Sequence, residues 1–221
     1  MCGRFDRHSE LDKFVSLVEG LVLDGAPDVP PSYNVCPSRD IVAIRARDDG
    51  RRQFVKLNWG LVPSWSARPD LRRPINARIE TAAEKPMFRA AFARHRCRVP
   101  CDGYYEWAAA DGSKQPFYFT APEGLLLAAI HEHNSRLEKP PLETVCLLTR
   151  DASEALAPIH NRMPVILRGP AAEAWLDPAM TPADLASLAR EDSEEELAFH
   201  PVSTFVNSPA NDSARCIERQ Q

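Results

Sequence analysis

Residues 97–100, CRVP, and residues 103–107, GYYEW, have the composition and the alternation of β-strands. In the second run the alternation places Tyr104 and Glu106 on one face of the strand, with the neighbouring aromatic side chains on the other. Similar β-like runs recur along the rest of the chain. They span residues 41–46, 54–59, 116–120, 125–131, 144–149, 165–167 and 199–203.

Helical patterns are fewer than strand patterns. Ser9 is placed to cap a helix that extends to Val18, and Asp151 is placed to cap a short helix through Leu156. Further helices are expected over residues 86–95, 169–177 and 182–190. Since no internal repeat or linker interrupts these segments, the sequence predicts the α/β (α+β) class, as a single domain over residues 1–221. A curved, largely antiparallel and barrel-like sheet forms its core, with helices at the periphery.

The charge balance argues against one class of nucleic-acid-binding protein. The chain has 221 residues and a formal net charge of -4, so it is not expected to coat nucleic acid through its overall charge. A local basic groove is still compatible with this total, and residues 68–98 supply a candidate. The basic residues there are Arg68, Arg72, Arg73, Arg78, Lys85, Arg89, Arg94, Arg96 and Arg98.

The sequence predicts a soluble protein without a cofactor. It contains no signal peptide and no apolar run long enough to span a bilayer, so a cytoplasmic location without membrane attachment is expected. The six cysteines are then expected to be reduced thiols. His95, Cys97 and Cys101 lack a second pair at metal-binding spacing, so no metal is expected. No phosphate-cradling glycine loop is present, and a nucleotide cofactor is not expected either.

The first residues, Met1-Cys2-Gly3, suggest a reactive amino terminus. Because the side chain at position 2 is small, Met1 is expected to be removed, which leaves Cys2 with a free amine and a thiol. Such an amine condenses with an aldehyde to an imine, and the adjacent thiolate then closes a thiazolidine ring intramolecularly. The alternative is an ordinary cysteine near a chain terminus.

Three further positions suggest proton transfer or anion binding. Glu106 is flanked by aromatic residues, and desolvation there would raise its pKa and allow it to give and take protons; the alternative is a solvated surface glutamate. His160 lies in a proline-bounded loop, where histidines are often functional or simply polar surface. Asn76 and Arg78 are two apart in an extended segment, so both point the same way and offer donors to an oxyanion or a phosphate.

Six segments together resemble one family. They are residues 1–5 (MCGRF), 33–38 (YNVCPS), 59–65 (WGLVPSW), 76–81 (NARIET), 98–107 (RVPCDGYYEW) and 160–165 (HNRMPV). In this order, over nearly the whole chain, they resemble the SRAP family, the SOS-response-associated peptidases that are also described as abasic-site processing proteins.

The resemblance implies that the chain is an enzyme-like protein that captures abasic sites in single-stranded DNA. The ring-opened sugar exposes an aldehyde, which Cys2 would trap as a thiazolidine crosslink that shields the lesion. By the same resemblance, Glu106 and His160 handle protons, and Asn76 positions the sugar and the amino terminus. The family is also described as cysteine peptidases that process their own N-terminus, which implies self-maturation at most.

The resemblance also implies how DNA is held. Arg4 and Arg78 bind the phosphates that flank the lesion. The path of the strand is lined by Asn34, Pro37, Trp65 and Thr149. From the sequence alone Trp65 is either a base-stacking or a core residue, whereas Trp59 is assigned to the core. The partner is single-stranded DNA, bound by a monomer that is nucleoid-associated when it acts.

The sequence departs from the family pattern at a few positions. Ser66 stands where a second aromatic residue often follows Trp65, Arg150 replaces a common threonine, and residues 131–133, HEH, replace a common Trp-Glu pair. Two other function classes are compatible with parts of the sequence. An N-terminal-nucleophile glutamine amidohydrolase also begins Met-Cys-Gly, but the Asn-Gly-Glu segment of that class is missing. A noncovalent single-strand-binding module would use the same basic groove without Cys2.

Overall fold

The computed structural model describes residues 2–47, 49–110, 113–137, 140–189 and 197–220. Met1 and the acidic run 191–196 therefore lie outside the described residues. Within the described segments, no helix is both long and apolar enough to cross a membrane.

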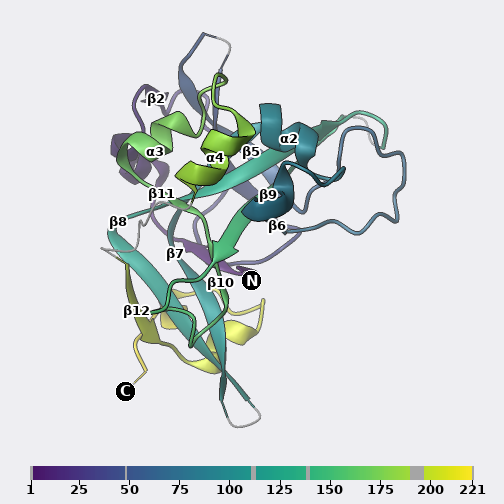
Figure 1. The fold of residues 1–221 in the computed structure, drawn as a ribbon. Coiled ribbons are helices and arrows are strands. Elements are labelled where there is room, and N and C mark those ends of the chain that lie inside the picture. The colour runs from purple at the N-terminus through teal and green to yellow at the C-terminus, as the bar shows by residue number, and fades with distance from the viewer. Residues whose placement is uncertain (1, 48, 111–112, 138–139, 190–196, 221) are drawn as a thin grey trace.

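One sheet organises the molecule (Figure 1). Its strands are β1 (Phe5–Arg7), β2 (Leu21–Val22), β3 (Ser32–Val35), β4 (Asp40–Ala46), β5 (Arg52–Trp59), β6 (Asn76–Arg78), β7 (Arg96–Ala110), β8 (Ser113–Asn134), β9 (Leu142–Asp151), β10 (Arg162–Pro164), β11 (Ile166–Leu167) and β12 (Ala198–Pro201). The main order is β11-β8-β9-β5-β4-β7-β1-β3, and β7 also pairs with β8. The pairing therefore runs in a ring from β8 through β9, β5, β4 and β7 back to β8. Most pairs are antiparallel, which confirms the predicted mixed α/β class with a largely antiparallel sheet.

The two long strands β7 and β8 form the frame on which the rest is built. Their pairing shifts register between Cys101 and Gly103, where β8 accommodates extra residues up to Gly124 at φ +91°. The two separate runs predicted at 116–120 and 125–131 are consequently one interrupted strand. Gly103 is required at this shift because a Cβ there would lie 2.4 Å from the backbone oxygen of Phe119.

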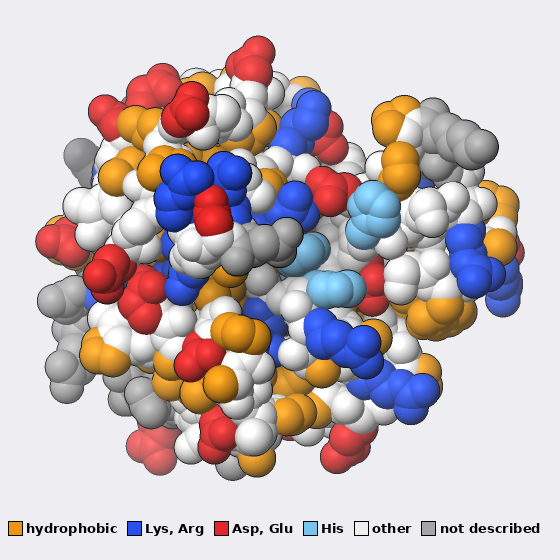
Figure 2. All heavy atoms as spheres, turned by 90° about the horizontal axis from the view of Figure 1, so that it is seen from above, with side chains coloured by type: hydrophobic (Ala, Val, Ile, Leu, Met, Phe, Trp, Pro, Cys, Tyr) orange, Lys and Arg blue, Asp and Glu red, His pale blue; other side chains and the backbone are white. Residues whose placement is uncertain are grey.

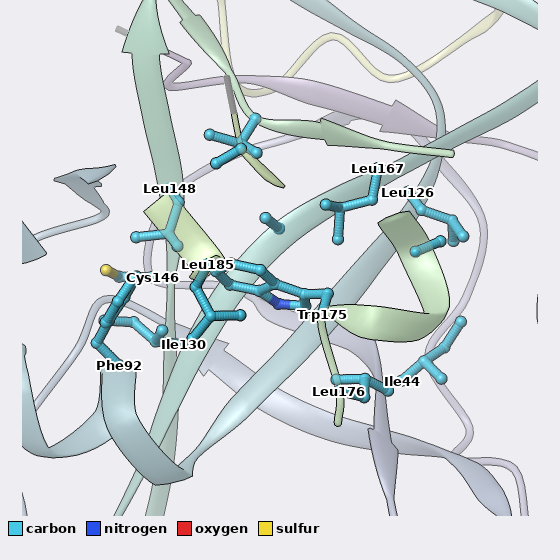
Figure 3. Packing of buried hydrophobic residues seen from close by; sticks show 14 of the residues in the cluster. Ile44, Phe92, Leu126, Ile130, Cys146, Leu148, Leu167, Trp175, Leu176 and Leu185 are labelled. Carbon is cyan, nitrogen blue, oxygen red and sulfur yellow. The ribbon is translucent and has the colours of Figure 1, made fainter. Parts of the chain in front are cut away.

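Short helices cover one side of the sheet, and the C-terminal segment lies along the lower half of the β7–β8 hairpin (Figure 1). The helices are η1 (Leu11–Leu17), α1 (Ile79–Ala82), α2 (Arg89–Arg94), α3 (Gly169–Ala174), α4 (Pro182–Leu188), η2 (Thr204–Asn207) and η3 (Ala214–Cys216). The apolar faces of η1 and of α1 to α4 pack on the sheet in one cluster with Trp175, which is fully buried (Figure 3). Val206 of η2 and Cys216 of η3 belong to a separate cluster with Tyr105 and Tyr118. The indole of Trp175 donates to the backbone oxygen of Cys97 at 3.0 Å, which satisfies its one polar group.

Three local expectations are wrong. Ser9 does not cap η1, whose N-cap is Glu10. The amide and the hydroxyl of Ser9 instead donate hydrogen bonds to the Asp102 carboxylate. Residues 154–159 form turns rather than a helix, and Asp151 ends β9 and binds Arg162.

The prediction of a basic groove over residues 68–98 is wrong for two of its arginines, Arg96 and Arg98. Arg96 is buried and donates to backbone oxygens, including that of Trp175 at 2.8 Å. Arg98 is fully buried and pairs with Glu173 at 2.9 Å. These two guanidiniums hold α3 and its following turn on the sheet, so they are unavailable to an external ligand. On the face seen from above, acidic and basic side chains are interspersed (Figure 2).

We predict that Gly103→Ala destabilises the protein by about 1–3 kcal/mol because the added methyl group has no room against β8. The measurement is the urea midpoint of unfolding at neutral pH. An unchanged midpoint would show that β7 and β8 can move apart at Gly103 to admit a methyl group without loss of stability.

Candidate active site

Strand β1 brings the amino terminus into the interior of the sheet. Phe5 pairs with Tyr104 of β7 on one side and with Val35 of β3 on the other. The Phe5 ring packs on Trp59 with a centroid distance of 5.2 Å. Cys2 belongs to the same buried cluster and has no exposed surface. Cys2 is thus packed as a core residue, as the other five cysteines are.

Asn76 fixes the main chain of Cys2. Strand β6 runs parallel to β9, and from it the Asn76 side-chain nitrogen donates to the Cys2 carbonyl at 2.8 Å. The Asn76 side-chain oxygen is buried and accepts no hydrogen bond from any described residue. A buried acceptor without a donor is costly, so this oxygen is suited to a donor on a ligand or on a processed amino terminus.

Glu106 lies beside this terminus, on the second half of β7. It is buried, and burial raises its pKa to about 7. The alternative of a solvated surface glutamate is therefore wrong. Burial also raises the pKa of the Cys2 thiol far above its ordinary value, and the Glu106 charge adds to that effect. The thiol is accordingly protonated in this state, and Glu106 is a group that exchanges protons near neutral pH.

His160 is half-buried and follows the turn at 154–159. Burial lowers its pKa, so the imidazole is neutral at pH 7. The backbone N–H of Arg162 donates to His160 Nδ1 at 3.0 Å. Nδ1 also lies 3.1 Å from the backbone oxygen of Arg162, so this nitrogen can accept from the N–H or, when it carries the ring proton, donate to the carbonyl.

The segment that holds His160 is fixed by Arg162, a residue that sequence reasoning did not assign to the site. Its guanidinium makes two bonds of 2.9 Å to the Glu80 carboxylate and one of 2.6 Å to the Thr149 carbonyl. The spacing of two between His160 and Arg162 was visible in the sequence, but the pairing of Arg162 with Glu80 of helix α1, a residue distant in sequence, was not.

A hollow of about 410 Å³ joins these groups at the surface. It is lined by Gly3, Arg4, Glu106, Trp107, Lys114, His160 and Asn207. Three predicted site residues, Arg4, Glu106 and His160, therefore share one opening next to Cys2. Lys114 and Asn207 were not predicted, because neither lies in a segment with a recognisable motif.

The half-buried Arg4 and the buried Asn34 are hydrogen-bonded to each other and to residues near the C-terminal end of the sequence. Arg4 donates to the Asn34 side-chain oxygen at 2.7 Å and to the Val206 carbonyl at 2.9 Å. The Asn34 amide nitrogen donates to the carbonyls of Val206, Ser208 and Asn211. Asn34 is 4% exposed, so its geometry makes it a residue that orients Arg4.

The remaining predicted DNA-binding residues differ in exposure. Arg78 is exposed and pairs in register with Thr149, which is fully buried. Pro37 is half-buried and precedes Ser38, which adopts φ +67°. Trp65 is 52% exposed, whereas Trp59 is buried as predicted. Arg78 and Trp65 are thus free to meet a ligand directly, while Thr149 shapes the site through its backbone bond to Arg162.

One cluster outside the hollow has the residue types of a metal site. Asp6, His8 and Asp102 place their ligand atoms within 4.8 Å of one another. The Lys13 ammonium already binds Asp102 at 2.5 Å, and the Tyr118 hydroxyl donates to Asp6 at 2.6 Å. The Lys13–Asp102 ion pair therefore ties η1 to β7, and the Tyr118–Asp6 hydrogen bond ties β8 to β1.

Comparison with known proteins agrees with this architecture. A family model described as SOS response associated peptidase (SRAP) matches residues 1–209. The abasic site processing protein YoaM of Bacillus subtilis is 36% identical, over 100% of this chain and 99% of its own length. YedK of Escherichia coli, also named an abasic site processing protein, is 30% identical over 99% of both chains. A crystal structure of a protein from Bacteroides thetaiotaomicron superposes with a TM-score of 0.84 at 25% identity, over 100% of both chains.

The chain belongs to the SRAP family. The solved relative shares its fold, a mixed α/β arrangement dominated by one large sheet with few helices. The resemblance drawn from the six sequence segments is thereby confirmed.

We predict that Glu106→Gln stabilises the protein above pH 7 by about 3 kcal/mol and has no effect below about pH 4.5. The folded state raises the Glu106 pKa from 4.5 to about 7, so ionising the carboxylate costs folding free energy as the pH rises between those values. Urea unfolding from pH 4 to pH 8.5 measures the difference. The exposed residue Glu123, changed to Gln, is the matched control and should show no such trend. Equal stability of Glu106→Gln and the parent at pH 8 would contradict the buried carboxylate.

Proposed function

We propose that this protein, acting as one SRAP domain, captures abasic sites in single-stranded DNA as a covalent thiazolidine through Cys2 after removal of Met1. The proposal extends what the relatives' names state, which is processing of abasic sites. The observation that carries it is the placement of Cys2: its carbonyl is held by Asn76, and Glu106 and His160 line the adjoining hollow.

The first steps involve the amine. His160, neutral at pH 7, is suited to accept the proton of the C1′ hydroxyl as the ring opens to the aldehyde and to return a proton to the ring oxygen. The free amine of Cys2 adds to the aldehyde carbon, and the resulting carbinolamine loses water to give an imine. The buried Asn76 oxygen is suited to accept a hydrogen bond from that amine and so to aim it.

The second stage involves the thiol. Since burial keeps the thiol protonated, a base must take its proton as the sulfur adds to the imine carbon. Glu106 is suited to this because its pKa of about 7 lets it accept a proton and return one. The sulfur–carbon bond forms, the imine nitrogen gains a proton, and the five-membered ring closes without an oxidant or a cofactor.

The surroundings favour DNA as the carrier of the aldehyde. Arg4, oriented by Asn34, opens onto the hollow, and the exposed Arg78 lies on β6 two residues from Asn76. Guanidiniums at these positions are suited to the phosphates on either side of an abasic sugar. Removal of Met1 by the protein itself, as the peptidase name of the family suggests, is included in the proposal as maturation of the amino terminus.

We predict that Cys2→Ala forms no denaturation-resistant adduct with an abasic oligonucleotide and that Cys2→Ser forms at most a reversible imine. Intact mass spectrometry of the parent and both variants, with and without the oligonucleotide, reports Met1 loss and adduct mass together. A stable adduct with either variant would contradict the thiazolidine. Binding without any adduct in the parent would favour a noncovalent single-strand module, and release of ammonia from glutamine would favour an amidohydrolase.

We predict that Arg78→Ala weakens binding to single-stranded DNA of any sequence and lowers the slope of log affinity against log salt by about 0.7, the value for one phosphate contact. Fluorescence anisotropy with a labelled oligonucleotide at several salt concentrations measures both quantities. Arg51→Ala removes an exposed arginine that pairs with Asp49 on the β4–β5 connection and serves as the control. Equal affinities and equal salt slopes for Arg78→Ala and Arg51→Ala would show that Arg78 does not contact the DNA.

A further inference from the structure

A turn at the start of the long connection between β5 and β6 carries the exposed Trp65. The turn is closed by a hydrogen bond of 3.0 Å from the Ser66 amide to the Pro63 carbonyl. Trp65 stands at its tip with 52% of its surface exposed, while Ser66 is buried. An indole is therefore held out into solvent by a turn whose other end is anchored in the protein.

Asn134, near the end of β8, clamps this turn. The residue has no exposed surface. Its amide nitrogen donates to the Pro63 carbonyl and to the Ser66 carbonyl, both at 2.8 Å. Its side-chain oxygen accepts from the backbone amides of Arg136 and Leu137 at 2.8 and 3.1 Å. One side chain thus uses both amide donors on the first and last carbonyls of the Trp65 turn.

Two further buried side chains hold the same turn. Glu132, 1% exposed, lies two residues before Asn134 on β8 and accepts from the Ser64 amide at 3.2 Å. Thr144 of β9, fully buried, accepts from the Val62 amide at 3.0 Å. Because residues two apart on a strand share a face, β8 presents the glutamate and the asparagine to the turn side by side.

This arrangement suits recognition better than stability. Burying an amide and a carboxylate is costly unless every polar atom is bonded, and here their bonds serve to fix an exposed segment. A fixed aromatic side chain loses less freedom when a base stacks on it than a mobile one does. The need is greater in this chain because Ser66, rather than a second aromatic residue, follows Trp65.

We propose that Asn134, supported by Glu132, is the positioning residue that holds Trp65 as a rigid stacking platform for a base beside the abasic site. The proposal deepens the proposed function and rests on it for the identity of the ligand. Its first half, the fixing of Trp65, is a property of the free protein and is measurable without DNA.

The first experiment uses Asn134→Asp, which keeps the shape of the side chain but removes both donors to the turn. In 5-fluorotryptophan-labelled protein, we expect the ¹⁹F resonance of Trp65 to shift and narrow. The resonances of the buried Trp59 and Trp175 should stay in place, which reports that the fold is intact. An unchanged Trp65 resonance would overturn the clamp. Should this variant not fold, Ser64→Gly loosens the same turn from an exposed position and is expected to give the same change.

The second experiment is a double-mutant cycle with an oligonucleotide that carries a tetrahydrofuran abasic analogue, which lacks the aldehyde and reports binding alone. We expect Asn134→Asp to weaken binding about tenfold, within the range of one base–aromatic stack. In a Trp65→Ala background it should weaken binding no further.

Each outcome separates the two proposals. A loss of affinity that persists in the Trp65→Ala background, or unchanged affinity in Asn134→Asp, overturns the role of Asn134 while leaving the crosslink intact. A parent protein that forms no adduct overturns the proposed function, yet the fluorine spectrum still tests whether Asn134 holds Trp65.

Discussion

The site depends on the pairing of β1 with β7. Phe5 lies in register with Tyr104, and this places Cys2 next to Glu106 in the interior, although the two are more than a hundred positions apart in sequence. The register is specified because one face of each strand is buried, and a slip by one residue would turn Phe5 out of the core. The hydrogen bond from Tyr118 to Asp6 also fixes this short strand, and the Asp102–Lys13 ion pair holds the following η1 on β7.

Burial sets the chemistry that this pairing makes available. Inside the sheet, the thiol of Cys2 holds its proton and Glu106 becomes a carboxyl group that titrates near neutrality. For each group the loss of water on burial is the largest influence on the pKa. The side-chain nitrogen of Asn76 donates to the Cys2 carbonyl, and the side-chain oxygen of Asn76 remains a buried acceptor without a donor among the described residues. The site therefore offers a buried acceptor to an incoming hydrogen-bond donor.

The sequence predicted the motifs better than the supports behind them. Strand patterns at 97–107 and 144–149 and the extended Asn76–Arg78 segment were recognisable because their periodicity is local. The bidentate Arg162–Glu80 pair and the Asn134 clamp were not, since each joins residues that only tertiary structure brings together. Arg96 and Arg98 were misjudged for a related reason. The sequence around an arginine on a strand does not reveal whether its side chain faces DNA or, as Arg98 does, pairs with Glu173 on a helix packed against the sheet.

The hydrogen bonds from Arg4 and Asn34 to residues 206–211 tie the beginning of the polypeptide to a segment made about two hundred residues later. During synthesis, the amino terminus leaves the ribosome long before those carbonyls exist. The hollow lined by Arg4 is consequently completed only after residues 206–211 have been made. A shorter nascent chain lacks the carbonyls that hold Arg4 and Asn34 in place.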